Sequence, residues 1–433
     1  MCTSSHSHRP GGRALAVALA AFALIVAGAG APAGPATDAC ETSAEWPGCP
    51  LAAGTEVLHA MQDGADKVTA GAELALAYLA VGDVETARSL LADANARALA
   101  IDDAATRTQA LTEIADAAAD AGLATGEQAL LAVWHAVQIA DPAKRADRLG
   151  RIAVLMARLG FGTDARRVAA ALPTGDGTLG AYQARTLQGI AEQFAANGQL
   201  EQAAATLASA TAGLIYYRAV GYAQIGRHAI LAGRPDLGEA WLDQAVRSAD
   251  EQTEGYFVAG ALRRIAAEYA AIGDMNTATR FFGRAVDGAR AASTQQQRAR
   301  ALSRIATTLA DLGLHERAVA CVNEAIAVAG ADSDRAIAAW VAYEIAGAAA
   351  FAGDGDTAYA VLETIPADVE FAGRPVRAAA QRDVAWGLAR HGDRRASLRL
   401  IGDIANARER VQALARLVRL HAQPDMPAYS RYL

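Results

Sequence analysis

Apolar positions recur along the chain with the spacing of buried helices. The stretch ALSRIATTLADLG, residues 301–313, places Leu302, Ile305 and Leu309 at intervals of three and four residues. This spacing predicts a helix with one apolar face. Gly313 then suits the left-handed backbone that ends a helix without strain on a side chain. The stretch is therefore predicted to be an amphipathic helix followed by a turn.

The same pattern occurs nine times, at spacings of 35 to 40 residues. The glycines that end it are Gly82, Gly122, Gly160, Gly198, Gly233, Gly273, Gly313, Gly353 and Gly392. Eight residues before each glycine stands Leu, Ile or Val, and the next residue is Ala in every copy except at Gly226. A second helical pattern follows each glycine, with a small residue five positions later in all copies but the one at Glu127. Each period therefore predicts an antiparallel helix pair, and stacked pairs bury a continuous core.

The order of residues within one period resembles the tetratricopeptide repeat. Residues 261–285 follow that family's order of large, small, aromatic, Gly, Ala, large and Ala, at Leu262, Ile265, Ala266, Tyr269, Gly273, Ala278, Phe282 and Ala285. The resemblance covers residues 67–404 and implies an all-α, right-handed α-solenoid of about nine antiparallel helix pairs. The period is mostly 38–40 residues instead of the family's 34, and the proline after the second helix is absent. A HEAT-like stack is therefore the alternative architecture.

The ends of the chain differ from the repeats. Residues 1–36 have the order of a secretory signal peptide, with arginines before an apolar run and then small residues. An uncleaved membrane anchor is the alternative. We expect an N-terminal segment with a lead-in helix over 37–66, a C-terminal capping helix over 405–421 and a tail over 422–433. The protein is thus predicted to be exported, periplasmic or secreted, with no integral membrane association after cleavage of the signal.

Export changes the interpretation of the cysteines. Cys40 and Cys49 stand close together in CETSAEWPGC and could close a short disulfide loop in an oxidising compartment. The alternative is two unpaired thiols. Cys321 falls on a predicted core position of a helix, where it would pack as a small apolar residue.

Charge and motifs restrict the chemistry. The formal charge is −7, or −9 once the two arginines of residues 1–36 are removed, which argues against a nucleic-acid partner. The chain has no phosphate-binding loop, no nucleophile motif and no histidines at metal-ligand spacing. We therefore predict no catalytic residue, no metal and no cofactor.

The resemblance also implies a ligand groove. In tetratricopeptide proteins the groove is lined by first-helix side chains that packing does not need, here thirteen, ten, six and two positions before each glycine. In the last two repeats these positions include aromatic residues and arginines, namely Trp340, Tyr343, Phe351, Arg382, Trp386 and Arg390. Such side chains are enriched in binding hot spots. The alternative is that the two tryptophans fill space between repeats.

A basic residue recurs fifteen positions before most of the glycines. The positions are Lys67, Arg107, Arg145, Arg218, Arg298, Arg377 and, in the final helix, Arg410. They could form a ladder for acidic ligands. Because a residue repeated in nearly every unit generally serves the unit, we predict instead that each one binds carbonyl groups left free by the preceding helix.

Together these patterns favour an exported, non-enzymatic scaffold that binds a peptide, protein or envelope component on its concave face. The alternative is an envelope-active or polysaccharide-active enzyme built on the same scaffold. Such an enzyme would need two carboxylates facing one another about 5 to 10 Å apart.

Overall fold

The computed structural model describes residues 40, 46–120, 122, 132–133, 135–174, 177–209, 215–330 and 334–424. Residues 34–433 belong to one compact unit. The predicted signal peptide and nearly all of the predicted tail lie outside the described residues.

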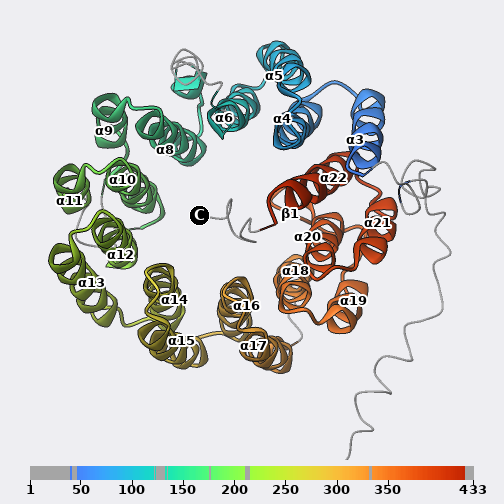
Figure 1. The fold of residues 1–433 in the computed structure, drawn as a ribbon. Coiled ribbons are helices and arrows are strands. Elements are labelled where there is room, and N and C mark those ends of the chain that lie inside the picture. The colour runs from blue at the N-terminus through green and yellow to red at the C-terminus, as the bar shows by residue number, and fades with distance from the viewer. Residues whose placement is uncertain are drawn as a thin grey trace, which may run out of the picture. The chain divides into compact units, whose positions relative to one another are not determined.

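The described part of the chain is all-α, as predicted, and is built from helix pairs (Figure 1). The first helices of the pairs are α4 (Ala65–Ala80), α6 (Ala104–Asp120), α8 (Pro142–Arg158), α10 (Thr178–Ala196), α12 (Ile215–Leu231), α14 (Gly255–Ala271), α16 (Gln295–Asp311), α18 (Arg335–Ala352), α20 (Val376–Arg390) and α22 (Ala407–Ala422). The second helices are α3 (Gly48–Ala60), α5 (Val84–Leu99), α9 (Gly162–Ala170), α11 (Leu200–Ala208), α13 (Pro235–Asp250), α15 (Met275–Arg290), α17 (His315–Val328), α19 (Gly355–Glu363) and α21 (Arg394–Gly402). A short hairpin of β1 (Glu370–Phe371) and β2 (Arg374–Pro375) precedes α20.

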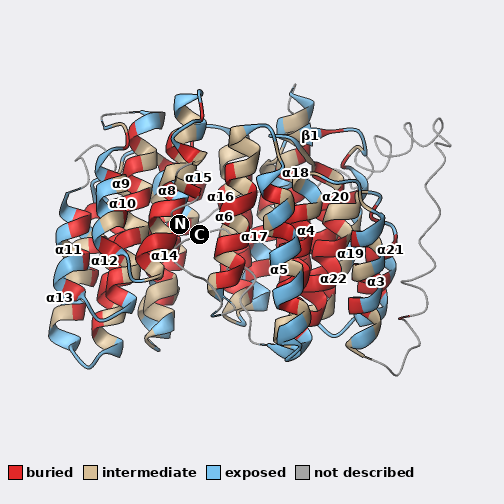
Figure 2. Ribbon diagram, turned by 90° about the horizontal axis from the view of Figure 1, so that it is seen from above, coloured by how far each residue is buried: buried red, intermediate tan, exposed pale blue. Residues whose placement is uncertain are grey.

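The repeating glycines end the first helices in the predicted way. All nine have positive φ, between 64° at Gly122 and 91° at Gly160. This left-handed conformation favours glycine because a Cβ atom would be strained there. The aliphatic residue eight positions earlier is buried in every copy, with at most 3% of its surface exposed. Figure 2 shows such buried positions on the helix faces that pack together.

The first helices form a closed ring within this unit (Figure 1). Each first helix from α4 to α20 packs on the next one, and α22 packs on both α3 and α4. Val411 and Val418 of α22 share an apolar cluster with Leu58 of α3 and Leu74 of α4. The array of helix pairs is therefore joined end to end, with the first helices inside and the second helices outside.

This closure changes the roles of the two terminal helices. The helix predicted over 405–421 corresponds to α22, but it does not cover the end of an open stack. It begins one more helix pair, and the second helix of that pair is α3, the expected lead-in helix. Arg408 Nη1 lies 3.0 Å from Asp66 Oδ1 across the junction of α22 and α4.

Six of the seven recurrent basic residues donate hydrogen bonds to backbone carbonyl groups between helix pairs, as predicted. Five of them donate to a carbonyl oxygen six residues earlier, at donor–acceptor distances of 2.6 to 3.0 Å: Lys67 to Met61, Arg107 to Ile101, Arg145 to Ile139, Arg298 to Ala292 and Arg410 to Ile404. Arg377 donates in the same way to the carbonyl of Ile365, 3.0 Å away. Arg218 differs, because it pairs with the carboxylate of Glu251.

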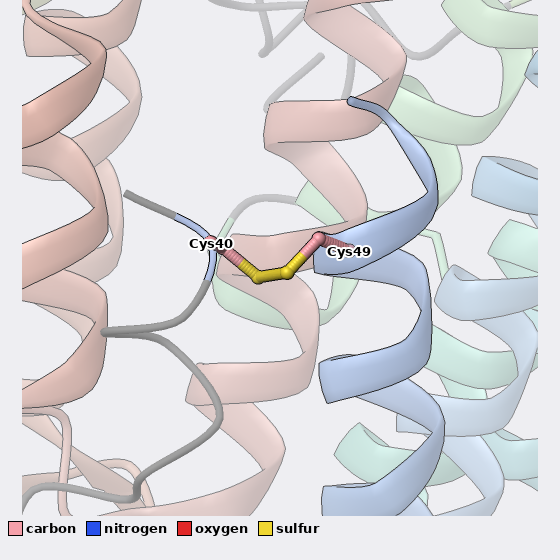
Figure 3. The surroundings of a disulfide bond; sticks show 2 residues. All are labelled: Cys40 and Cys49. Atoms are coloured by element: carbon pink, nitrogen blue, oxygen red, sulfur yellow. A yellow bond between two sulfur atoms is a disulfide. The ribbon is translucent and has the colours of Figure 1, made fainter. Parts of the chain in front are cut away.

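Cys40 and Cys49 are joined by a disulfide, which links residue 40 to the first turn of α3 (Figure 3). Cys321 is a free, buried thiol in the core, as predicted. Among the described helices, α18 is long and apolar enough by length and composition to cross a membrane. However, 61% of that stretch is buried inside the protein, as is typical of a core helix.

Candidate functional site

A cavity of about 430 Å³ lies against the inner helices, with lining residues on α10, α12, α14, α16, α18 and α20. Eight of the described lining residues are aromatic. Four come from α12 and α14, namely Tyr216, Tyr217, Tyr256 and Phe257. The other four come from α18 and α20, namely Trp340, Tyr343, Phe351 and Trp386. Four of the six inner helices thus contribute aromatic side chains, in two groups that are separated by α16.

Four of the six predicted groove residues, Trp340, Tyr343, Phe351 and Trp386, line this cavity. Arg382 and Arg390 do not. Arg382 is 1% exposed, and its guanidinium contacts Asp383 and Glu409. The guanidinium of Arg390 donates to Asp311 Oδ1 at 2.6 Å. Arg382 therefore joins α20 to α22, and Arg390 joins α20 to α16, so neither arginine lines the cavity.

The predicted aromatic residues both line the cavity and fill space between helices. Tyr343, Phe351 and Trp386 are only 6 to 7% exposed, whereas Trp340 is half-buried. The hydroxyl of Tyr343 lies 2.7 Å from Asp383 Oδ2. Trp340 Nε1 donates to Glu344 Oε1 at 3.1 Å. The surfaces left open to the cavity are thus small parts of well-packed side chains.

The aromatic residues of α12 and α14 were not predicted, and they are more open. Phe257 is 47% exposed, and its ring centroid lies 6.1 Å from that of Tyr216 and 5.7 Å from that of Tyr256. These residues lie sixteen or seventeen positions before Gly233 and Gly273, one helical turn before the first position that the prediction considered. Extending the predicted face of each first helix by four residues toward its N-terminus would include them.

The cavity lining carries charges of both signs. It contains four arginines, Arg185, Arg263, Arg264 and Arg304, and two carboxylates, Glu344 and Asp383. Four of these six residues, Arg264, Arg304, Glu344 and Asp383, stand nine positions before a repeat glycine, beside the predicted position ten. Arg185 is paired with Asp147 and Arg304 with Glu344, so much of this charge is balanced within the protein.

Both carboxylates are already held by arginines. Glu344 Oε1 lies 3.2 Å from Arg300 Nη2 and 3.0 Å from Arg304 Nη2. Asp383 Oδ1 accepts from Arg382 at 2.7 Å and from Arg416 at 2.8 Å. Burial by itself would raise the pKa of Asp383, but the two guanidinium groups hold it well below the usual range. Asp383 therefore stays ionised.

One acid near the cavity has a pKa that is raised instead of lowered. Burial raises the pKa of Glu192 on α10, Arg264 opposes that shift, and Glu268 adds to it. Within the described ranges, no group of three or more His, Cys, Asp or Glu side chains could hold a metal ion. The chemistry offered by the cavity itself is therefore aromatic contact and hydrogen bonding, beside charges that are paired within the protein.

No protein-family model matches the chain, and no curated protein matches it. Some solved structures show a distant likeness, and two of those given below are described as repeat proteins. A kinesin light chain of Podosopora anserina with nearly identical TPR-like repeats has 16% identity over 55% of this chain and 96% of its own, with a TM-score of 0.31. Ton1535 from Thermococcus onnurineus NA1 has 15% identity over 77% and 94%, with a TM-score of 0.28.

A circular tandem repeat protein with novel repeat topology has 16% identity over 87% of this chain and 97% of its own, with a TM-score of 0.22. All of these likenesses are distant. The assignment of the chain as a TPR-like helical repeat therefore rests on its own helix pairs, glycine turns and buried repeat positions.

Proposed function

We propose that this protein is an exported, non-enzymatic scaffold that binds a peptide segment of a partner protein in the inner-face cavity. The observation that carries the proposal is the cavity against six consecutive inner helices, with eight aromatic side chains from four of them in its lining. The volume of about 430 Å³ is within the range of ligand-binding pockets, roughly 300 to 1,000 Å³. A site spread over six helices suits an extended chain better than a compact molecule.

Phe257 is the side chain that we expect to contribute most to binding. It is 47% exposed, and Tyr216 and Tyr256 flank it. Aromatic side chains bury a large area with few rotatable bonds, so they are frequent binding hot spots. A peptide that covers Phe257 would remove this exposed apolar surface from water.

Two features support export. The order of basic, apolar and small residues in 1–36 is that of a secretory signal. The Cys40–Cys49 disulfide is the kind of bond that persists in oxidising compartments. Both features fit a protein that works in a periplasm or outside the cell.

Glu192 favours a second candidate, an envelope-active or polysaccharide-active enzyme. Burial raises its pKa, so it would keep a proton more readily than an exposed glutamate, but it does not line the cavity itself. The two carboxylates of the cavity give less support, because each is held by two arginines. Loss of polysaccharide hydrolysis in a Glu192→Gln variant would establish this alternative.

Site-specific photo-crosslinking tests the scaffold proposal. A photoreactive amino acid placed at position 257 is expected to capture a partner protein in the envelope of the producing cells. The control places the same amino acid at Phe161, which is 40% exposed and does not line the cavity. The captured partner is then titrated against the wild-type, Phe257→Ala and Phe161→Ala proteins.

The expected result is capture at position 257 only, with affinity weakened on the order of tenfold by Phe257→Ala and unchanged by Phe161→Ala. Equal capture at both positions, or equal affinity of both variants, would reject the inner face as the binding site.

A further inference from the structure

The aromatic residues of the cavity form two groups, one on α12 and α14 and the other on α18 and α20. The helix between them, α16, has no aromatic residue. It lines the cavity without a large apolar side chain, through Ala301, Ser303, Arg304 and Thr307. Each aromatic group has a ring with open surface, since Phe257 is 47% exposed and Trp340 is half-buried. The cavity therefore offers two apolar contacts with a strip of small and hydrophilic side chains between them.

One carboxylate joins the two groups across α16. Glu344 Oε1 accepts from Trp340 Nε1 at 3.1 Å and from Arg304 Nη2 at 3.0 Å. Nη1 of the same guanidinium donates to the hydroxyl of Tyr256 at 2.8 Å. Tyr256 lies beside Phe257, with the ring centroids 5.7 Å apart. A continuous chain of contacts thus runs from one aromatic group to the other.

Glu344 is held firmly within this chain. Its side chain is only 11% exposed. Arg300 binds both of its oxygens, with Nε 3.2 Å from Oε2 and Nη2 3.2 Å from Oε1. A two-point contact between an arginine and a carboxylate fixes direction as well as distance. Glu344 therefore sets the position of Trp340 relative to Tyr256.

This geometry limits the ligands that can use both apolar contacts. The helices α14 and α18 pack on opposite sides of α16. Packed helices lie about 8 to 10 Å apart, so α14 and α18 are separated by about 20 Å or less. An extended chain crosses that distance with about six residues. Arg304 is neutralised by Glu344, so the segment of a ligand that crosses α16 needs no charge of its own.

We propose that Glu344 is a positioning residue that sets the distance between two subsites, one at Phe257 and one at Trp340. The partner is then a peptide with two bulky apolar residues at one fixed spacing, joined by small or neutral polar residues. This inference rests on the proposed function, the binding of a peptide on the inner face. It specifies the residue pattern that the partner carries and the side chain that selects it.

A random linear peptide library displayed on phage provides the probe. Selections are run against the purified wild-type protein and the Glu344→Ala, Glu268→Ala and Phe257→Ala variants. Glu268→Ala is the matched control. The Glu268 side chain is 12% exposed and pairs with Arg227 of a neighbouring inner helix, but it does not line the cavity. Thermal unfolding establishes that each variant is folded.

Peptides selected on the wild-type and Glu268→Ala proteins should share two apolar positions at one spacing. Those selected on Glu344→Ala should keep the position that depends on Phe257 and lose the fixed spacing. A selected peptide is then synthesised with one residue inserted between its two apolar positions. By calorimetry, the insertion should weaken affinity on the order of tenfold on the wild-type and Glu268→Ala proteins, and less than about twofold on Glu344→Ala.

The opposite outcomes are equally specific. Peptides that require Phe257 but carry a single apolar position would overturn the inference and leave the proposed function standing. An insertion penalty that is the same on the wild-type and Glu344→Ala proteins would do so as well. If no selected peptide depends on Phe257, both are overturned.

A second variant covers the case in which Glu344→Ala does not fold. Trp340→Phe keeps an aromatic ring but removes the donor that Glu344 binds. The insertion penalty should fall in this variant too, because the ring is no longer held at a set distance from Phe257. An undiminished penalty would overturn the inference.

Discussion

At the scale of single residues, Asp383 is central to the packing of α20 against its neighbours. It accepts from Arg382, Arg416 and Tyr343. Replacing it with Asn would remove the counter-charge that Arg416 binds and would leave Arg382 with Glu409 as its counter-charge. We expect Asp383→Asn to lower the free energy of unfolding by about 3 to 5 kcal/mol.

Urea unfolding measures this effect against a matched exposed pair. Asp368 binds Arg335 at 2.7 Å, and both side chains are more than 60% exposed. Asp368→Asn should therefore cost less than about 1 kcal/mol. Equal losses in the two variants would contradict the assignment of Asp383 as a structural ion.

The same carboxylate makes stability depend on pH. Because the pKa of Asp383 is lowered in the folded state, its contribution is complete above the unfolded pKa of about 4. That contribution is lost as the pH falls from there toward the lower folded pKa. Acid titration of the free energy of unfolding should therefore show a steeper loss in the wild-type protein than in Asp383→Asn. Parallel curves would contradict this linkage.

Cys321 should be chemically inert in the folded protein. It is 7% exposed, and burial raises the pKa of its thiol to about 11. The thiolate is the reactive form, so little of it is present at mildly alkaline pH. In a Cys2→Ser variant, an alkylating reagent should modify no thiol in the native state and one after unfolding in urea, as measured by mass spectrometry. Rapid native labelling would place Cys321 at the surface.

Part of the cavity could be predicted from the sequence, because residues three or four positions apart lie on the same face of a helix. The predicted register found Trp340, Tyr343, Phe351 and Trp386. The predicted positions begin thirteen residues before each glycine, so they miss Phe257, which lies one helical turn closer to the N-terminus of its helix. The register also placed Arg382 in the groove, because nothing local shows that Glu409, 27 residues later, binds that guanidinium.

At the scale of helices, α12 and α13 approach one another more closely than an alanine allows. A Cβ atom on Gly226 would lie 2.9 Å from the carbonyl oxygen of Gly238, and one on Gly238 would lie 2.7 Å from that of Gly226. Backbone atoms at these distances cannot move aside as the end of a flexible side chain can. This contact explains why Gly226 departs from the alanine of the other repeats.

Gly226→Ala should therefore destabilise the protein, although alanine stands at the equivalent position in every other repeat. We expect a loss of about 1 to 3 kcal/mol from overpacking. Gly283→Ala in α15 is the control, because no atom lies within 4 Å of its added Cβ. That variant should be neutral or stabilised by up to about 1 kcal/mol, since alanine favours a helix. Differential scanning calorimetry separates the two, and a stable Gly226→Ala protein would contradict the close approach.

The helices and turns could be predicted because their signals are local. Spacings of three and four residues give the buried face, and one glycine ends each first helix. The pairing of α22 with α3 could not be predicted in the same way. The two helices stand at opposite ends of the chain, and their apolar faces gave no sign of which partner each would cover.

At the scale of the whole described unit, closure of the ring replaces the end caps of an open solenoid. Terminal repeats normally need a polar outer face to stay soluble. Here the apolar faces of α22, α3 and α4 cover one another, with Val411 and Val418 packed near Leu58 and Leu74. Closure also places the cavity on the inner face of a ring, because its lining residues come from the first helices.

The distance between residues 66 and 408 tests closure most directly. Spin labels attached to an Asp66→Cys/Arg408→Cys protein report it by pulsed electron resonance. An Arg335→Cys/Asp368→Cys protein is the control, because these residues form an ion pair near one another in the chain and would stay neighbours in an open solenoid as well. We predict a short and narrow distance distribution for both proteins, as the Arg408–Asp66 contact requires. A long or broad distribution for 66 and 408, with a short one for the control, would show that the array is open and would contradict the ring.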